Sequence, residues 1–508
     1  MALATLPSES PTLDALIERR AKERGLAPYL LEARGTRVQS FVDLRDEVAA
    51  LRARLTAWDL NAGERVGLLL EDPLTFASWF LAGLASGVWV APLDPTLTST
   101  NDRLFVDRAR TLNLSAVVSD REAPPATSLP WYQVERADGE RTEVSRVPHS
   151  VGGGGVILSS SGTTGSPKVV PLDTARLLTT ATLVARHNRL DHHDRGFNPL
   201  PLWHVNAQVV ALLATLVAGS SLVLEDRFHR TGFWKLIDDF DVTWINTVPA
   251  IIARLVVTQG DESTLEKVRF VRSASAPLSP ALLERFEAMT GVPVVESYGM
   301  TEAASQICAN PVDGVRKAGS VGVPVGVEVR VVLVEGAGGT NVGSIEIRGS
   351  TVISAYESAS YADRFDADGW LRTGDLGYFD EDGYLFIVGR SDDVINRGGE
   401  KIYPLEIENV LVAVDEVALA VVVGESDEVF GQVPVAYVQP RDVAVLRSSA
   451  DSAALVRTLR LQLVEAFTKA QRPARVRLVH RLPANGTGKV RKASVRAGDV
   501  IVDYEEAL

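Results

Sequence analysis

The chain has 508 residues, more than one ordinary hydrophobic core accommodates, so we expect two or more domains. Its hydrophobic share of 46% and charged share of 23% are typical of a globular protein. The net charge of −13 disfavours sequence-independent binding of nucleic acid, which needs clustered positive charge. Cys308 is the single cysteine, so no intramolecular disulfide can form, and we expect a small apolar core residue there.

The sequence contains no pattern typical of export or of a membrane span. Its first ten residues lack the basic start and apolar core of a signal peptide. The most apolar stretch, residues 209–224, is shorter than the ~20 residues that a span needs and is interrupted by Gly219. We interpret this stretch as a buried helix followed by a strand, and we expect a cytoplasmic protein.

The first part of the chain alternates between helical and strand-like patterns. Amphipathic periodicity predicts helices over residues 13–25 and 46–58. Short apolar runs at residues 65–71, 87–93 and 115–120 indicate buried strands. This alternation is typical of parallel strands joined by crossover helices and therefore predicts an α/β fold.

Two later regions depart from this pattern. Residues 323–348 alternate with a period of two, which predicts a small antiparallel β unit. After about Arg390 a new set of elements begins, and we expect a small α+β C-terminal domain. Its predicted elements are a helix at residues 404–411, strands at 418–424 and 433–439, and a helix at 452–467.

Two glycine-containing loops each end in one of the few lysines of this arginine-rich chain. Residues 159–168 (SSSGTTGSPK) follow a predicted strand and combine hydroxyls, glycines and Lys168, which is the inventory of a phosphate-binding loop. A Walker loop is excluded because a strand former and a proline follow Lys168 instead of a helix. Residues 483–489 (PANGTGK) end in Lys489, a point charge suited to a developing oxyanion. On composition or spacing alone, a flexible loop and a surface turn are the alternatives.

Residues 298–302 (YGMTE) and 373–375 (TGD) lie between these two loops. With all four motifs in this order, nearly the whole chain resembles the adenylate-forming superfamily of acyl-CoA synthetases, adenylation domains and luciferases. Within it, the chain is most similar to standalone acid–CoA ligases. The resemblance implies a domain over residues 1–390 that binds ATP and an acid, and a mobile domain over residues 391–508 that carries the catalytic lysine.

The resemblance also implies how ATP and Mg²⁺ are bound. Tyr298 would stack on adenine, Thr301 would bond the α-phosphate, and Glu302 would hold Mg²⁺, a cation that prefers carboxylate oxygen. Asp375 would accept hydrogen bonds from the ribose hydroxyls. Taken singly, Tyr298 could equally be a core residue and Asp375 a turn residue. The other residues implied for the nucleotide site are Ser161, Gly162, Thr163, Thr164, Gly165, Lys168, Ser275, Gly299 and Arg390.

The catalytic step and the domain movement are implied in the same way. Lys489 would bridge the substrate carboxylate and the α-phosphate as negative charge builds. Asp392 matches the hinge about which the C-terminal domain turns between the two half-reactions. Gly399 matches the turn beside the pantetheine of coenzyme A, and Arg397 with Lys401 could contact its phosphates.

The segment at residues 199–207 (PLPLWHVNA) matches the border of the acid pocket. Trp203 and His204 would line the pocket, where His204 either gates it and assists catalysis or simply packs. Asn206 and Asn246 add polar groups, which either satisfy local backbone groups or meet an oxygen of the substrate away from its carboxylate. Ala274 would form the wall toward adenine. Because no aspartate lies near Trp203, amino-acid substrates are disfavoured.

We therefore expect an enzyme that uses ATP and Mg²⁺ to convert a carboxylic acid, whether linear, aromatic or polycyclic, into an acyl-adenylate, and then transfers the acyl group to coenzyme A. A separate acyl carrier protein as acceptor is the first alternative. A non-catalytic nucleotide-binding protein is the second, which the intact lysines and carboxylates of the four motifs disfavour. No nucleic-acid partner is expected.

Overall fold

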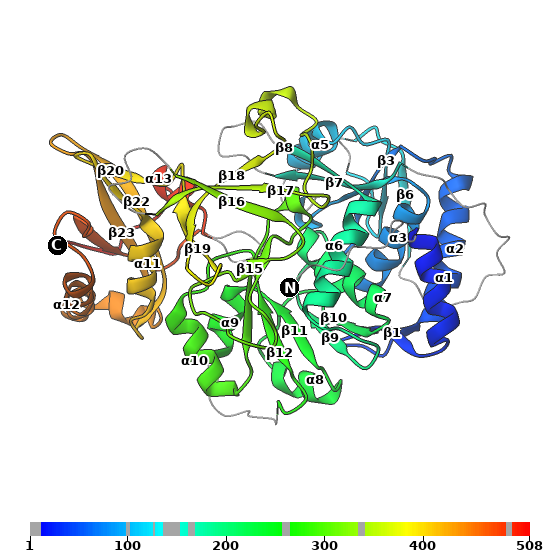
Figure 1. The fold of residues 1–508 in the computed structure, drawn as a ribbon, viewed down its shortest axis with the longest axis horizontal. Helices are drawn as coiled ribbons and strands as arrows, with labels where there is room; N and C mark the ends of the chain where they lie inside the picture. Colours follow the sequence, from blue (N-terminus) through cyan, green and yellow to red (C-terminus); the bar gives the residue numbers. More distant parts are fainter. Residues whose placement is uncertain are drawn as a thin grey trace.

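A computed structural model describes residues 12–97, 102–124, 127–135, 153–160, 168–256, 265–333, 341–483 and 490–508. Figure 1 shows two large sheets with their helices on one side of the molecule, a smaller sheet in the middle, and the C-terminal elements at the far left. No helix in these ranges is both long and apolar enough to cross a membrane.

The first large sheet has the strand order β6-β5-β3-β4-β7-β8 and is parallel except for β8. Three of its strands were predicted from their apolar runs, and these runs are confirmed as β3, β4 and β5. Its strands are β3 (Arg65–Leu69), β4 (Trp89–Pro92), β5 (Ala116–Ser119), β6 (Trp131–Gln133), β7 (Gly155–Ser160) and β8 (Lys168–Asp173), and the helices of this region are α1 (Leu13–Arg24), α2 (Phe41–Ala57), α3 (Pro73–Ala85) and α5 (Asp102–Thr111).

The second large sheet has the order β15-β14-β13-β12-β11-β9-β10-β1-β2 and is parallel from β13 to β1. Its strands are β1 (Pro28–Glu32), β2 (Val38–Ser40), β9 (Arg195–Asn198), β10 (Ser221–Leu224), β11 (Trp244–Thr247), β12 (Phe270–Ser273), β13 (Val294–Tyr298), β14 (Cys308–Ala309) and β15 (Val323–Pro324). Its helices are α6 (Thr174–His187), η1 (Ala207–Leu213), α7 (Ala214–Ala218), α8 (Phe233–Asp239), α9 (Pro249–Val256), α10 (Pro280–Thr290) and η2 (Thr301–Ala303).

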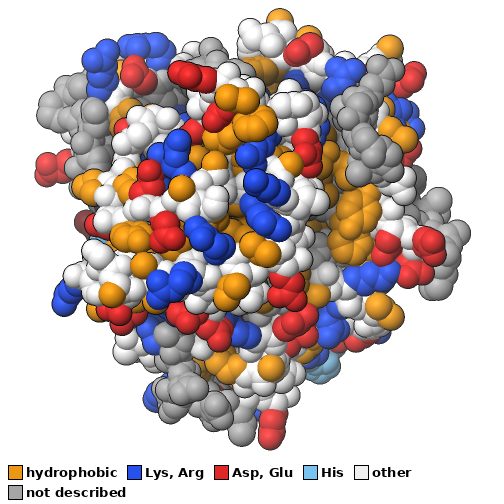
Figure 2. Space-filling view, turned by 90° about the vertical axis from the view of Figure 1, so that its left-hand side faces the viewer, with side chains coloured by type: hydrophobic (Ala, Val, Ile, Leu, Met, Phe, Trp, Pro, Cys, Tyr) orange, Lys and Arg blue, Asp and Glu red, His pale blue; other side chains and the backbone are white. Residues whose placement is uncertain are grey.

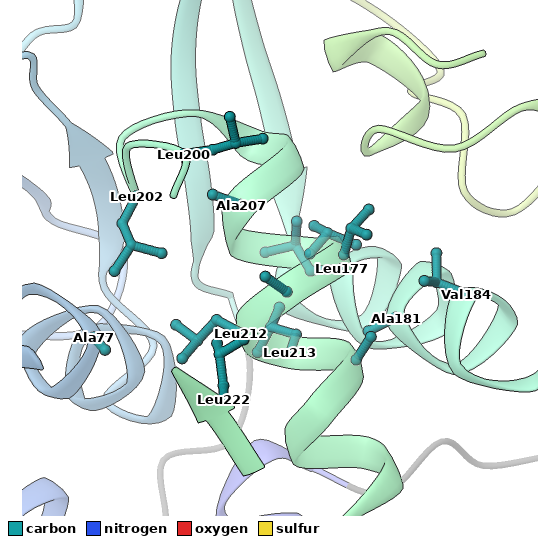
Figure 3. Close-up of a cluster of buried hydrophobic side chains, with 14 of the residues drawn as sticks. Ala77, Leu177, Ala181, Val184, Leu200, Leu202, Ala207, Leu212, Leu213 and Leu222 are labelled. Atoms are coloured by element: carbon teal, nitrogen blue, oxygen red, sulfur yellow. The ribbon is translucent and has the colours of Figure 1, made fainter. Parts of the chain in front are cut away.

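The apolar stretch at residues 209–224 forms a buried helix followed by a strand, as predicted. The helix starts as η1, a π-helix, and continues as α7 before β10. Figure 3 shows Ala207 and Leu213 of η1 beside Leu177 and Ala181 of α6, which enclose the helix in the apolar core. This packing explains the hydrophobicity of the segment, because every residue of η1 is buried.

The predicted antiparallel unit is a four-stranded sheet with the order β16-β17-β18-β19. Its elements are β16 (Glu328–Leu333), β17 (Gly343–Arg348), η3 (Ala359–Arg364), β18 (Leu371–Phe379) and β19 (Leu385–Arg390). In this sheet Asp375 pairs in register with Arg390, and this places two predicted site residues side by side.

The C-terminal elements form a separate six-stranded sheet with its own hydrophobic core. The predicted helix–strand–strand–helix order of this region is confirmed, while the boundary at Arg390 stays a prediction. The elements are β20 (Ile395–Arg397), β21 (Glu400–Ile402), α11 (Pro404–Val412), β22 (Val417–Asp427), β23 (Gly431–Pro440), η4 (Val443–Arg447), α12 (Ser449–Ala466), β24 (Arg475–Leu478), α13 (Lys492–Arg496) and β25 (Tyr504–Ala507).

Candidate active site

One group of predicted residues meets where the second sheet contacts the antiparallel unit. Tyr298 ends β13 and donates its hydroxyl hydrogen to Asp375 Oδ2 on β18. Arg390, the last residue of β19, donates from Nη1 to Asp375 Oδ1 at 3.2 Å. Burial raises the pKa of Tyr298, so its phenol is neutral at physiological pH. The tertiary structure thus joins three residues that the sequence separates by up to 92 positions.

Gly299 follows Tyr298 at a close approach between two backbone segments. A Cβ atom on Gly299 would lie 1.9 Å from the carbonyl oxygen of Ser305, so no other residue fits there without displacement. Ala304 and Ser305 adopt positive φ angles of 47° and 82°, which turn the chain back toward Tyr298. This turn encloses Thr301 and Glu302 in the short helix η2.

A second group surrounds the predicted magnesium ligand. Glu302 is buried and accepts a hydrogen bond from the hydroxyl of Tyr356 at 2.8 Å. Lys168 Nζ lies 5.7 Å from the ring centroid of Tyr356 and 5.1 Å from that of Tyr361. Burial lowers the pKa of Lys168, and the positive charge of Arg364 lowers it further. Tyr356 was not predicted from the sequence, because an isolated aromatic residue gives no signal for a contact with a distant carboxylate.

The residues around Glu302 fit a bound Mg²⁺ ion. In the described part of the chain no group of three or more histidine, cysteine or acidic side chains could hold a metal. A single carboxylate is nevertheless a suitable protein ligand for Mg²⁺, because this ion usually takes its other ligands from substrate phosphates and water. Ser161, Gly162, Thr163, Thr164, Gly165 and Lys489 were predicted to act on those phosphates and lie outside the described residues.

The predicted hinge lies next to this site. Arg390 donates from Nε to Asp392 Oδ1 at 3.3 Å, so one guanidinium contacts both Asp375 and Asp392. Gly399 is exposed in the turn between β20 and β21, with a φ of 99°. Arg397 donates from Nη1 to the carbonyl oxygen of Ala470 at 2.6 Å. Its guanidinium carbon lies 5.0 Å from the centroid of the Phe430 ring. Its side chain is therefore engaged within the C-terminal sheet.

The predicted acid-pocket residues lie at the ends of neighbouring strands and at the start of η1. The rings of Trp203 and His204 lie 5.9 Å apart, and burial lowers the pKa of His204, which is therefore neutral at pH 7. Ala274 is buried directly after β12. Ser275 follows it in the left-handed region, with a φ of 73°, and is exposed.

Five buried polar residues form what we call the polar cluster. Asn246 Nδ2 donates both to Asn206 Oδ1, at 2.8 Å, and to Asn198 Oδ1, at 2.9 Å. Arg272 donates to Gln306 Oε1 at 2.7 Å and approaches Asn246 Oδ1 at 3.5 Å. The sequence indicated only Asn206 and Asn246. A charged residue in a short strand that begins with two apolar residues was the signal that could have revealed Arg272.

The comparisons with known proteins agree with this geometry. The sequence model of the AMP-binding enzyme matches residues 17–357, and that of the AMP-binding enzyme C-terminal domain matches residues 406–489. A sulfoacetate–CoA ligase of Cupriavidus necator is 34% identical, over 97% of this chain and 99% of its own. An oxalate–CoA ligase of Arabidopsis thaliana is 31% identical, over 96% and 98%. The solved o-succinylbenzoate CoA synthetase of Bacillus subtilis, in complex with its acyl-adenylate intermediate, is 26% identical over 96% and 99%, with a TM-score of 0.82.

The chain therefore belongs to the AMP-binding enzyme family. The predicted fold class and the predicted class of enzyme, an acid–thiol ligase that forms AMP, are confirmed. These relatives do not favour the two alternatives, transfer to a carrier protein and non-catalytic nucleotide binding.

Proposed function

We propose that this protein couples the cleavage of ATP to AMP and pyrophosphate with the joining of a carboxylic acid to coenzyme A. The observation that carries the proposal is the convergence of two groups of side chains, one around Asp375 and one around Glu302. In the first half-reaction an oxygen of the acid attacks the α-phosphorus and pyrophosphate leaves. In the second, the thiolate of coenzyme A attacks the acyl carbon and AMP leaves.

The group around Asp375 suits the nucleoside part of ATP. The carboxylate of Asp375 is an acceptor that ribose hydroxyls can use, and Arg390 holds it in place through Oδ1. The ring of Tyr298 offers an aromatic face to adenine. Because Gly299 must remain without a side chain, the position of Tyr298 relative to the turn after it is fixed.

The group around Glu302 suits the phosphates. Mg²⁺, when bound, would neutralise phosphate charge, and Glu302 would hold it with the orientation that Tyr356 imposes. Lys168 supplies a positive charge close by, and Thr301 supplies a hydroxyl. We assign to Lys489 the neutralisation of the charge that builds between the acid and the α-phosphate. No side chain is required as a covalent nucleophile, since positioning and charge neutralisation carry the reaction.

The test is acid-dependent release of pyrophosphate from Mg-ATP, with and without coenzyme A. The relatives named above act on acids that each carry a second acidic group, so the panel pairs such acids with simpler ones. Oxalate, malonate, succinate and sulfoacetate are compared with acetate, propionate and butyrate. Lys489→Ala is the inactive variant, and Lys235→Ala, which removes an exposed lysine of α8, is its matched control.

We expect at least one acid to release pyrophosphate, coenzyme A to form a thioester with it, and Lys489→Ala to lower the first step by at least about 100-fold. Release without any thioester would overturn coenzyme A as the acceptor. Equal activity of Lys489→Ala and Lys235→Ala would overturn the role of Lys489.

A further inference from the structure

Arg272 is a buried arginine without an acidic partner in the described part of the chain. It lies on β12, and only 1% of its surface is exposed. Burial lowers the pKa of its guanidinium to about 9, so the group still carries its positive charge at neutral pH. Because an isolated buried charge costs several kcal/mol, arginines in protein interiors are normally paired with a carboxylate.

The groups that Arg272 does contact are neutral. Its Nη2 donates to the amide oxygen of Gln306 at 2.7 Å, and its Nη1 is 3.5 Å from the amide oxygen of Asn246. The buried carboxylate of Glu296 belongs to the next strand, but Arg272 is in register with Val295, so Glu296 points to the other face of the sheet. Two amide dipoles orient the guanidinium without neutralising it.

The polar cluster lies where a substrate of this fold is expected. Arg272, Asn246 and Asn198 stand near the carboxyl ends of three adjacent parallel strands, β12, β11 and β9. Open α/β sheets bind their ligands outside this end of the strands. Arg272 is two residues before Ala274 of the predicted acid pocket. Gln306 is four residues after Glu302, the predicted magnesium ligand. The cluster therefore lies close in sequence to both parts of the predicted active site.

A second buried donor accompanies Arg272 in the cluster. Asn206 accepts from Asn246 through Oδ1, while its own Nδ2 has no hydrogen-bond partner among the described residues. An unpaired amide donor and an uncompensated guanidinium at one place both call for acceptor oxygens that carry negative charge. An anionic group would satisfy both.

We propose that the polar cluster binds a second anionic group of the acid substrate, a carboxylate or a sulfonate, through Arg272 with Asn206 as an additional donor. The inference rests on the proposed function, because it names the class of acid that the ligase activates: acids that carry a second negative charge away from the reacting carboxylate. A planar guanidinium can bind such a group through two parallel hydrogen bonds. A monoanionic acid has no second anionic group to accept them, because its one carboxylate is the group that reacts.

The test compares kcat/KM for the seven acids of the panel in the wild type and in Arg272→Met, which is similar in length but uncharged. We expect the wild type to prefer dianionic acids by at least about 100-fold, because a site built for a polar group rejects analogues that lack it. Arg272→Met should lose at least about 100-fold on the dianionic acids and change less than about threefold on the others. Arg272→Lys, which keeps a charge but not the planar fork, should lie between.

Arg52→Met is the control for loss of a buried arginine. Arg52 lies on α2 and is paired with Asp14 of α1, away from the polar cluster. The variant Arg52→Met should leave the preference between dianionic and monoanionic acids unchanged. A preference of the wild type for monoanionic acids, or an equal loss on both classes in Arg272→Met, would overturn the inference while leaving the ligase function intact. Absence of pyrophosphate release with every acid would instead contradict the proposed function.

Thermal unfolding provides a readout that does not depend on turnover. Malonate, succinate or sulfoacetate should raise the Tm of the wild type but not that of Arg272→Met, since a ligand stabilises only the form that binds it. An equal rise of Tm in both proteins would contradict the proposed role of Arg272. If chloride raised the Tm of the wild type as much as the dianionic acids do, the cluster would be a site for an inorganic anion and the inference would be wrong.

Discussion

Glu302 and Tyr298 are each positioned by a residue from a distant segment. Tyr356 holds the carboxylate of Glu302, and Asp375 holds the hydroxyl of Tyr298. Tyr356 lies between β17 and β18 and Asp375 lies on β18, so the antiparallel unit supplies both supports of the predicted nucleotide site. The sequence motifs identified Glu302, Tyr298 and Asp375, whereas Tyr356 belongs to none of them.

The variant Tyr356→Phe tests this support. It keeps the ring beside Lys168 but removes the hydrogen bond to Glu302, whose loss costs about 1 kcal/mol. We expect the Mg²⁺ concentration for half-maximal pyrophosphate release to rise about fivefold, with little change at saturating Mg²⁺. Tyr378→Phe, on β18, is the control and should leave the Mg²⁺ dependence unchanged. A fall in kcat at saturating Mg²⁺ without a shift of the half-maximal concentration would contradict this role.

Gly299 is a residue for which the structure leaves no substitute. Gly299→Ala would place a methyl group 1.9 Å from the carbonyl oxygen of Ser305 and should displace the turn after Tyr298. We expect the KM for ATP to rise at least about tenfold or the protein to lose at least about 2 kcal/mol of stability. Ala304→Gly in the same turn should be tolerated, because its φ of 47° suits glycine. Equal KM and stability of Gly299→Ala and the wild type would show that the turn adapts.

At the scale of elements, β13 carries a buried carboxylate that the reaction does not use. Burial raises the pKa of Glu296 to about 8. Its Oε1 accepts the backbone N–H of Leu278, and its Oε2 has no hydrogen-bond partner among the described residues. Between the unfolded pKa of about 4.3 and this folded value, the folded protein holds a proton that the unfolded chain has lost. The free energy of unfolding therefore falls as the pH rises through this window.

The variant Glu296→Gln keeps the acceptor and removes the titration. Near the lower end of the window the variant and the wild type should have similar stability. At pH 8 the variant should be more stable by about 5 kcal/mol. Urea unfolding at both pH values measures the difference. An identical pH dependence in the two proteins would show that Glu296 is not protonated in the fold.

Helix η1 shows what an element's sequence does and does not reveal. The apolar composition of residues 209–224 predicted a buried helix followed by a strand, and Figure 3 shows side chains that pack around the helix. The π-helical hydrogen bonding was not predicted, because apolar periodicity does not distinguish a π-helix from an α-helix.

Asp375 and Arg390, two predicted nucleotide-site residues, lie on the antiparallel unit just before the C-terminal elements begin. Arg390 links Asp375 to Asp392, the predicted hinge, so the predicted nucleotide site and the predicted hinge share one side chain. Figure 2 views the molecule from the C-terminal side and shows acidic and basic side chains interspersed with apolar ones over the described part of that face.

The variant Asp392→Pro tests the hinge, because proline fixes one backbone torsion and so restricts the movement between two conformations. We expect the first half-reaction to keep at least about a third of its rate while overall thioester formation falls at least about tenfold. Acid-dependent ATP–pyrophosphate exchange measures the first half-reaction, and thioester formation measures both. Asp392→Ala, which removes the carboxylate but leaves the torsion free, should lose less. A proportionate loss in both measurements would argue against a hinge.

The sequence by itself determined the alternating fold, the antiparallel unit, the C-terminal elements and the residues of the motifs, because apolar periodicity and glycine-rich loops are local signals. It also indicated polar groups in the acid pocket through Asn206 and Asn246. Only the tertiary structure decided which side chains meet. Arg272, Gln306 and Tyr356 lie on separate segments, and their roles follow from sheet order, register and burial, which no local pattern specifies.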